Sequence, residues 1–196
     1  MSEKSPFAGV WCPSVTPFNA QGAVDIDALG RHFSRLNDSG IDTLLVMGSI
    51  GEFASLTQQE RLQLIQEARP LSSLKMVANV SATCIPDMLE LAEAAWKNDF
   101  DAVMVLPPYY YGQTQNQLMH YFEALDAQLG GKWFAYNFPA RTGCDLTPAL
   151  IAALAAKLPN FAGIKDTVDC LSHNRMMIEE TRKVRSDFAV LSGYDE

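Results

Sequence analysis

Short apolar runs alternate with longer amphipathic segments along the whole chain. An apolar run of four to eight residues between turn signals predicts a buried strand, whereas apolar positions at helical spacing predict an amphipathic helix. Seven runs are of the strand type, and they begin near Val10, Ile41, Lys75, Asp101, Lys132, Phe161 and Phe188. Their starts lie 26 to 34 residues apart, which fits a repeated unit of one strand, one helix and two short loops.

The segments between these runs carry helix-start signals. Thr57 and Glu60 have the spacing of a capping box, and Pro86 and Pro148 suit a first helical turn. No Pro/Gly/Ser linker or low-complexity stretch divides the chain. We therefore predict a single domain over residues 1–196.

Strand–helix repetition implies a parallel sheet with helical crossovers, either doubly wound or closed as a (β/α)₈ barrel. A doubly wound nucleotide-binding domain should show a glycine fingerprint after its first strand, and "TPFNAQGAVD" has none. The even spacing favours the α/β class with a TIM barrel. Because such a barrel typically needs about 250 residues, we predict one truncated after about seven strands. It would lack the eighth βα unit and the C-terminal helical segment.

Composition narrows the function classes. The chain is 48% hydrophobic, enough for a sizeable core, and only 19% charged, which argues against disorder. Its net charge of −8 argues against nucleic acid or an anionic membrane as partner. The start "MSEKSPF" lacks the apolar core of a signal peptide, and no apolar run has the length of a membrane span. These features predict a soluble cytoplasmic protein.

Cysteine and histidine spacing gives little support to a metal site. No CxxC, HxH or HExxH pattern occurs, so the cysteines are predicted to be free thiols. The cysteines are Cys12, Cys84, Cys144 and Cys170, and the histidines, each on a helix-like segment, are His32, His120 and His173.

Polar residues follow several predicted strands, where a barrel places its catalytic groups. The second strand ends at Ser49, between glycines, and the fourth ends in three tyrosines, 109–111. The fifth ends at Tyr136 with Arg141 nearby, and the sixth ends at Lys165. In a closed barrel these ends face one mouth, so Lys165, Tyr136 and Ser49 are expected to converge.

Together, these side chains could carry out a covalent reaction with a carbonyl compound. A lysine whose pKa falls below its usual value of about 10.4 can attack a carbonyl and form a Schiff base, which acts as an electron sink. A tyrosine hydroxyl bonded to a serine hydroxyl can carry the protons. Gly48 and Gly51 would let the backbone approach a substrate, where exposed amides suit a carboxylate.

Each feature also has a simpler interpretation. Lys165 could be a surface charge or the partner of Asp166, and the tyrosine run could serve packing or an interface. The "GSIG" sequence could be an ordinary turn, and Arg141 an ordinary surface arginine. Their joint placement at successive strand ends favours a site.

The pattern resembles the dihydrodipicolinate synthase/N-acetylneuraminate lyase (DapA) family of class I pyruvate-dependent aldolases. The motifs are "GSIGE" (48–52), "PPYYY" (107–111), "YNFPARTG" (136–143), "GIKDT" (163–167) and "LSGYDE" (191–196). They occur in the family's order, and the resemblance extends from about Val10 to the last residue. The resemblance implies a (β/α)₈ barrel, Schiff-base chemistry on pyruvate and an aldehyde, no metal or other cofactor, and a homo-oligomer, usually a tetramer of tight dimers.

Position by position, the resemblance implies that Lys165 is the Schiff-base lysine and Tyr136 the proton-shuttling tyrosine. Ser49 matches the hydroxyl residue that links this tyrosine to a second one, Tyr110, which reaches in from the neighbouring subunit. The Ser49 and Ile50 amides would hold the pyruvate carboxylate. Ile50 replaces a common threonine, which removes a hydroxyl but keeps the amide.

Substrate choice remains open between two branches. "YNFP" and "GIKDT" are closer to the 2-keto-3-deoxy sugar acid aldolases, which cleave and form these acids reversibly as carbon–carbon lyases. Thr167, two residues beyond Lys165 and on the same strand face, could bond a sugar-acid hydroxyl, and Gly193 is a further expected substrate-binding residue. Arg141, however, matches the arginine that binds aspartate semialdehyde in 4-hydroxy-tetrahydrodipicolinate synthases.

The length of the chain adds a hypothesis of another class. Relatives are roughly a third longer, consistent with the size of a full barrel, and without an eighth strand the first and seventh would be open edges. The chain could then be a non-catalytic remnant or a 2-keto acid binding module. At the family level we favour an enzyme.

Overall fold

The computed structural model describes residues 5–194, in which seven strands alternate with helices. Each strand starts within two residues of its predicted start. The strands are β1 (Trp11–Pro13), β2 (Thr43–Val46), β3 (Lys75–Asn79), β4 (Ala102–Val105), β5 (Trp133–Asn137), β6 (Phe161–Asp166) and β7 (Ala189–Ser192). The chain divides into two compact units, and β4 begins in one and ends in the other. The predicted single domain stays a prediction.

The helices lie in the segments between the strands. They are α1 (Ile26–Asn37), α2 (Gln58–Ala68), α3 (Ile85–Lys97), α4 (Gln115–Leu129), α5 (Pro139–Thr142), α6 (Pro148–Lys157) and α7 (Leu171–Arg182), with 3₁₀ turns η1 (Phe53–Ser55) and η2 (Arg69–Leu71). Pro86 and Pro148 lie in first helical turns, as predicted. No described helix has both the length and the apolar character that a membrane crossing requires.

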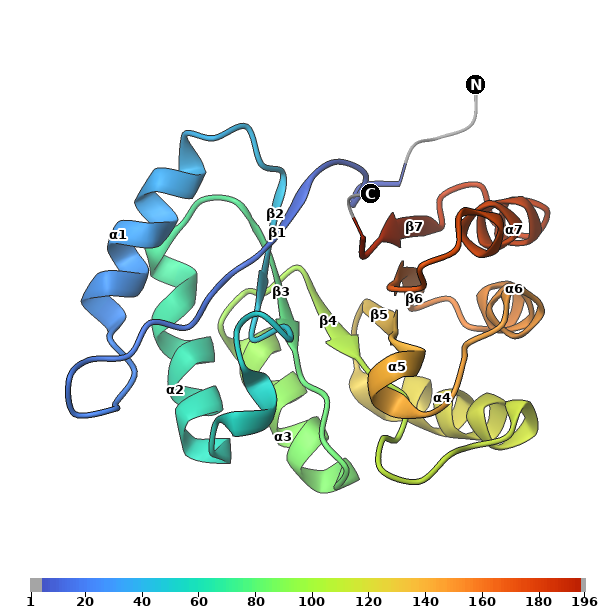
Figure 1. The fold of residues 1–196 in the computed structure, drawn as a ribbon, viewed down its shortest axis with the longest axis horizontal. Helices are drawn as coiled ribbons and strands as arrows, with labels where there is room; N and C mark the ends of the chain where they lie inside the picture. Colours follow the sequence, from blue (N-terminus) through green and yellow to red (C-terminus); the bar gives the residue numbers. More distant parts are fainter. Residues whose placement is uncertain (1–4, 195–196) are drawn as a thin grey trace. The chain divides into compact units, whose positions relative to one another are not determined.

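The amino-terminal unit comprises residues 9–80 and 84–103. Its strands β1, β2 and β3 pair in parallel, with Trp11 opposite Thr43 and Thr43 opposite Lys75. Helices α1, α2 and α3 lie on one side of these strands, in the blue to green part of Figure 1. Every residue of β2 is buried, which explains why this strand reads as a continuous apolar run rather than an alternating one.

The predicted capping box begins α2. The Thr57 hydroxyl accepts from the Glu60 backbone N–H at 3.2 Å, and the Glu60 carboxylate accepts from the Thr57 N–H at 2.8 Å. Thr57→Ala is expected to lower the free energy of unfolding by about 1 kcal/mol, because it leaves a first-turn N–H without its acceptor. Urea titration followed by circular dichroism measures the change, and Thr57→Ser, which keeps the hydroxyl, should stay near wild type. Equal stability of Thr57→Ala and wild type would contradict a role for the cap.

The carboxyl-terminal unit has a described part of residues 5–8, 81–83 and 104–194. Its strands β5, β6 and β7 pair in parallel, and α4, α6 and α7 lie on one side of them (Figure 1). Aromatic rings fill the layer between helices and strands. The Trp133 ring stacks on Phe161 at a centroid distance of 4.2 Å and on Phe122 at 5.5 Å.

Gly163 lets β6 approach β7 closely. A Cβ atom at this position would collide with the backbone oxygen of Ala189 and with the ring of Phe134. This glycine, in the "GIKDT" motif, therefore has a packing role two residues before Lys165. From Gly163 onward, the register pairs Gly163 with Ala189 and Lys165 with Leu191.

The cysteines and histidines are spread over several elements of the described residues. Cys12, Cys84, Cys144 and Cys170 are free thiols, and the three histidines lie on α1, α4 and α7. Within residues 5–194, no group of three or more His, Cys, Asp or Glu side chains is arranged to hold a metal ion.

Candidate active site

Lys165 and Tyr136 occupy facing positions on neighbouring strands. The register of β5 and β6 pairs Tyr136 with Lys165 and Asn137 with Asp166. Lys165 is half-buried near the end of β6, and its Nζ lies 4.4 Å from the centroid of the Tyr136 ring. Tyr136 is only 2% exposed. The ring face thus gives the amine a defined place beside the phenol.

Thr167 and Gly193 lie just beyond this pair. The Thr167 N–H donates to the Asn137 carbonyl, and the Gly193 N–H donates to the Asp166 carbonyl, both at 2.8 Å. A Cβ on Gly193 would collide with the Thr167 side chain, so the two residues are in close contact. The Thr167 hydroxyl is buried and has no hydrogen-bond partner within the described part of the chain. A buried hydroxyl in this state can accept or donate to a ligand.

Arg141 and Tyr110 lie on the surface of the same unit. Arg141 belongs to the short helix α5, and its guanidinium lies 5.9 Å from the centroid of the Phe138 ring. Tyr110 is 85% exposed and has a backbone φ of 86°. Left-handed backbone is uncommon for a bulky residue and often marks a functional segment. The motif residues 195 and 196 lie outside the described residues.

Ser49 and Ile50 belong to the amino-terminal unit, in an exposed turn after β2. Gly51 is required there, because a Cβ atom would lie 2.9 Å from the Ser14 carbonyl oxygen. The Asn79 side chain donates to the Met47 carbonyl at 2.8 Å, which fixes the start of the turn. Since Ser49 and Lys165 lie in different units, their convergence stays a prediction.

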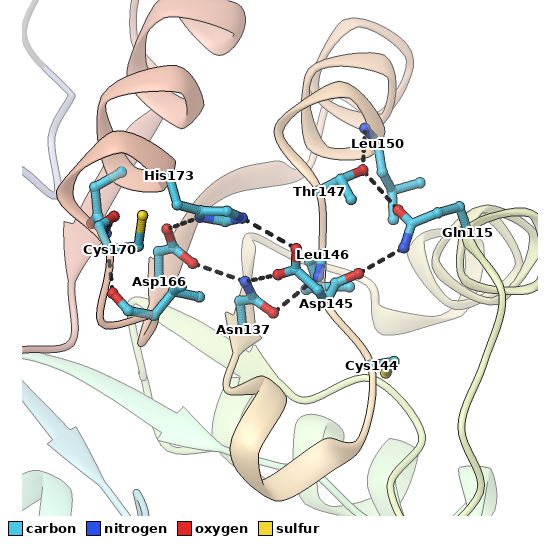
Figure 2. Close-up of polar contacts among 12 residues, drawn as sticks. Gln115, Asn137, Cys144, Asp145, Leu146, Thr147, Leu150, Asp166, Cys170 and His173 are labelled. Carbon is cyan, nitrogen blue, oxygen red and sulfur yellow. Dashed lines mark hydrogen bonds and ion pairs between the residues drawn. The ribbon is translucent and has the colours of Figure 1, made fainter.

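Four polar side chains form a closed ring of hydrogen bonds in the carboxyl-terminal unit (Figure 2). Asn137 Nδ2 donates to Asp145 Oδ1 and to Asp166 Oδ1, both at 2.8 Å. His173 Nδ1 lies 2.8 Å from Asp166 Oδ2, and His173 Nε2 lies 3.3 Å from Asp145 Oδ2. Asn137 and Asp166 are fully buried. We call this set the Asn137–Asp145–Asp166–His173 ring.

The electrostatics of the ring favour a charged imidazole. Burial alone would lower the pKa of His173, but the hydrogen bond and negative charge of Asp166, with those of Asp145, outweigh it. The pKa of His173 is therefore raised above its ordinary value of 6.5.

A family model places the chain among known proteins. The model of the "Dihydrodipicolinate synthetase family" matches residues 6–196, nearly the whole chain. The chain belongs to this family. The resemblance inferred from the strand-end motifs is thereby confirmed.

Two proteins of Escherichia coli K12 are similar to this chain over nearly its whole length. The "Putative 2-dehydro-3-deoxy-D-gluconate aldolase YagE" is 34% identical over 100% of this chain and 66% of its own length. The "Probable 2-dehydro-3-deoxy-D-pentonate aldolase YjhH" is 31% identical over 97% of this chain and 64% of its own length. The chain thus spans about two thirds of the length of these relatives, which are about half again as long and not, as predicted, a third longer.

Solved structures confirm the fold class of this family member. The structure of E. coli YagE in complex with pyruvate matches with a TM-score of 0.93 and 34% identity, covering 97% of this chain and 65% of that one. The 2-keto-3-deoxygluconate aldolase of Picrophilus torridus matches with a TM-score of 0.91 and 27% identity, covering 96% and 68%. The predicted (β/α)₈ class is confirmed, with seven strands in the described part of this family member.

The Asn137–Asp145–Asp166–His173 ring was not among the features predicted from the sequence. Asp166 entered only as a partner for Lys165, and His173 only as a lone helical histidine. A usable signal was present, because Asn137 and Asp166 directly follow Tyr136 and Lys165. Two polar residues at the ends of adjacent buried strands need hydrogen-bond partners.

Proposed function

We propose that this protein is a class I aldolase, a carbon–carbon lyase that reversibly cleaves a 2-keto-3-deoxy sugar acid to pyruvate and an aldehyde. The observation that carries the proposal is Lys165 Nζ at 4.4 Å from the centroid of the Tyr136 ring, on paired strands. The names of YagE and YjhH, and the pyruvate in the YagE structure, support the substrate class.

The proposed chemistry begins with the Lys165 amine attacking the keto carbon of the substrate, followed by loss of water. The resulting protonated imine accepts the electron pair of the cleaved carbon–carbon bond and becomes an enamine. The Tyr136 oxygen takes the proton from the hydroxyl of the departing aldehyde as it passes its own proton to the Ser49 relay, which returns a proton for the next step. Protonation of the enamine and hydrolysis of the imine then release pyruvate and restore the amine.

The other motif residues bind substrate in this proposal. The Ser49 and Ile50 amides hold the pyruvate carboxylate, and the Ser49 hydroxyl relays protons to Tyr136. Thr167, whose buried hydroxyl has no partner within residues 5–194, bonds a sugar-acid hydroxyl close to Gly193. The exposure of Tyr110 supports its role in a neighbouring subunit, and hence a homo-oligomer.

An exposed arginine supports a second candidate, condensation of pyruvate with aspartate semialdehyde. Arg141 presents a guanidinium fork, which suits the planar carboxylate of that aldehyde. The 4-hydroxy-tetrahydrodipicolinate synthase of Pseudomonas aeruginosa is 32% identical over 96% of this chain and 64% of its own length. Both candidates use the same Schiff base. A cytoplasmic location stays a prediction in either case.

Borohydride trapping tests the proposed function. The protein is incubated with pyruvate, reduced with borohydride, and analysed by intact mass and peptide mapping. We expect one stable pyruvate adduct on the peptide that contains Lys165, because reduction makes the imine permanent. A folded protein without an adduct would contradict the Schiff-base chemistry and favour a non-catalytic remnant or binding module. Turnover of pyruvate with glyceraldehyde or with aspartate semialdehyde then separates the two candidates.

A further inference from the structure

The hydrogen bonds of the Asn137–Asp145–Asp166–His173 ring can be fully assigned. The Asn137 amide has two hydrogens and gives one to each aspartate, using one oxygen of each carboxylate. The remaining oxygen of each carboxylate faces one nitrogen of His173. Since an ionised carboxylate only accepts hydrogen bonds, both imidazole nitrogens must carry hydrogen to complete the ring. A neutral imidazole would leave a lone pair against a carboxylate.

Few other charges lie near this histidine. The carboxylates that act on it are Asp166, from β6, and Asp145, from the segment before α6. The only charged residue of α6, Lys157, is its last residue and pairs with Glu123 of α4. On α7 itself, Arg175 pairs with Glu179. The charges that raise the pKa of His173 are therefore those of the two aspartates, and they act against its burial.

The ring connects the ends of the two strands that carry Lys165 and Tyr136, here called the reactive pair. Asn137 and Asp166 are opposite one another in the β5–β6 register, one residue after Tyr136 and Lys165. Because successive side chains of a strand point to opposite faces, the ring lies on one face and the reactive pair on the other. His173 belongs to the first turn of α7, and Asn137 Oδ1 also accepts from the Leu146 N–H at 3.0 Å. The ring thus joins β5, β6, α7 and the segment before α6.

We propose that His173 is a positioning residue for the Schiff-base reaction, acting as an imidazolium that closes this ring and holds Lys165 in register with Tyr136. The inference rests on the proposed function of Lys165. His173 is 13% exposed at its side chain and Asp166 is 0% exposed, so water competes little for their contact. His173 acts through Asn137 and Asp166 and touches neither the Lys165 amine nor its substrate.

The titration of His173 gives this role a pH dependence of known sign. Its pKa in the folded protein is raised above 6.5, so the closed ring is fully present below pH 6.5 and is lost as pH rises through the folded pKa. Attack on a carbonyl requires the unprotonated form of an amine, which makes Schiff-base formation in general faster as pH rises. With rising pH, loss of the closed ring slows adduct formation while deprotonation of the amine speeds it. The ratio of the wild-type rate to that of a His173 variant separates the two effects.

The experiment compares wild type with His173→Gln, which is neutral at every pH. The rate of borohydride-trapped pyruvate adduct is measured from pH 5.5 to 9.5, and the His173 ring protons are titrated by NMR over the same range. We expect wild type to be about tenfold faster below the His173 pKa and the ratio to fall toward one above it, because small displacements of reacting groups cost this much or more. Any pH dependence that the two proteins share cancels in the ratio.

Asp145→Asn provides the sharper test. The Asp145 side chain is 39% exposed, so its replacement should not prevent folding. Removing its charge should lower the pKa of His173, and the step in the rate ratio should move to lower pH by the same amount as the NMR titration. A purely structural contact would not move the step. His120→Gln, on the exposed face of α4, is the matched control and should follow wild type at every pH.

Each outcome decides a different claim. A rate ratio near one at all pH values, with an adduct in both proteins, would overturn the positioning role alone. The positioning role would also be overturned if Asp145→Asn shifted the NMR titration of His173 but left the step in the rate ratio at the same pH. Absence of any adduct in wild type would overturn the proposed function and this inference with it. An NMR pKa of His173 at or below 6.5 would overturn the imidazolium while leaving the Schiff base intact.

Discussion

Lys165→Ala should form no borohydride-trapped adduct with pyruvate at any pH between 6 and 9. Within the described part of the chain, this amine lies over the Tyr136 ring at 4.4 Å, and alanine leaves no nucleophile in its place. Lys165→Arg should also give no adduct, because a guanidinium keeps the charge and much of the length but does not lose its proton. Intact mass after reduction measures both variants. The arginine variant thereby separates loss of the nucleophile from loss of the positive charge.

Lys157→Ala is the matched control for this experiment. Lys157 ends α6 and pairs with Glu123 at 2.7 Å on the surface of the same unit. Its replacement removes a surface ion pair worth about 0–1 kcal/mol, so the adduct should form as in wild type. A mass increase that persists in Lys165→Ala would locate the reactive amine elsewhere and would contradict the assignment. Circular dichroism of each variant would show whether a missing adduct reflects lost chemistry or lost structure.

The alternation of strands and helices could be predicted because the central strands are buried on both faces. β2 and β4 consist entirely of buried residues and therefore read as unbroken apolar runs. Strand ends were less predictable. The first run, "VWCPSV", forms ladder pairs only at Trp11–Pro13, and apolar character alone does not distinguish paired residues from the loop that follows. The capping box of Thr57 was predictable because both partners lie within one helical turn.

The site could be predicted only in part, because its contacts depend on strand register. The sequence indicates that Tyr136 and Lys165 both end strands, but only the β5–β6 pairing places them opposite one another. Asp145 lies 28 residues from its partner His173, and no local spacing connects them. A single histidine on a helix gives no indication of a carboxylate at each of its nitrogens. Long-range polar contacts of this kind arise from the fold rather than from a motif.

Asp166→Ala should lower the free energy of unfolding by about 3 kcal/mol at pH 6, because it breaks a buried ion pair and leaves partners without acceptors. In the folded protein the Asp166 carboxylate accepts from His173 and from Asn137, and it is fully buried. Its removal leaves one nitrogen of His173 and one amide hydrogen of Asn137 facing a cavity without their acceptor. Urea titrations of both proteins at pH 6 and pH 9 measure the loss.

The loss should be smaller at pH 9 than at pH 6, and the sign follows from His173. Its folded pKa is raised, so the ion pair stabilises the protein fully below pH 6.5 and this contribution is lost as pH rises through the folded pKa. Once the imidazole is neutral, the charge contribution is gone, and only the hydrogen bonds and the packing of the carboxylate remain to be removed. Asp169→Ala, an exposed aspartate three residues along the chain, should change stability little at either pH. An equal loss for Asp166→Ala at both pH values would show that the stabilisation does not depend on the imidazolium.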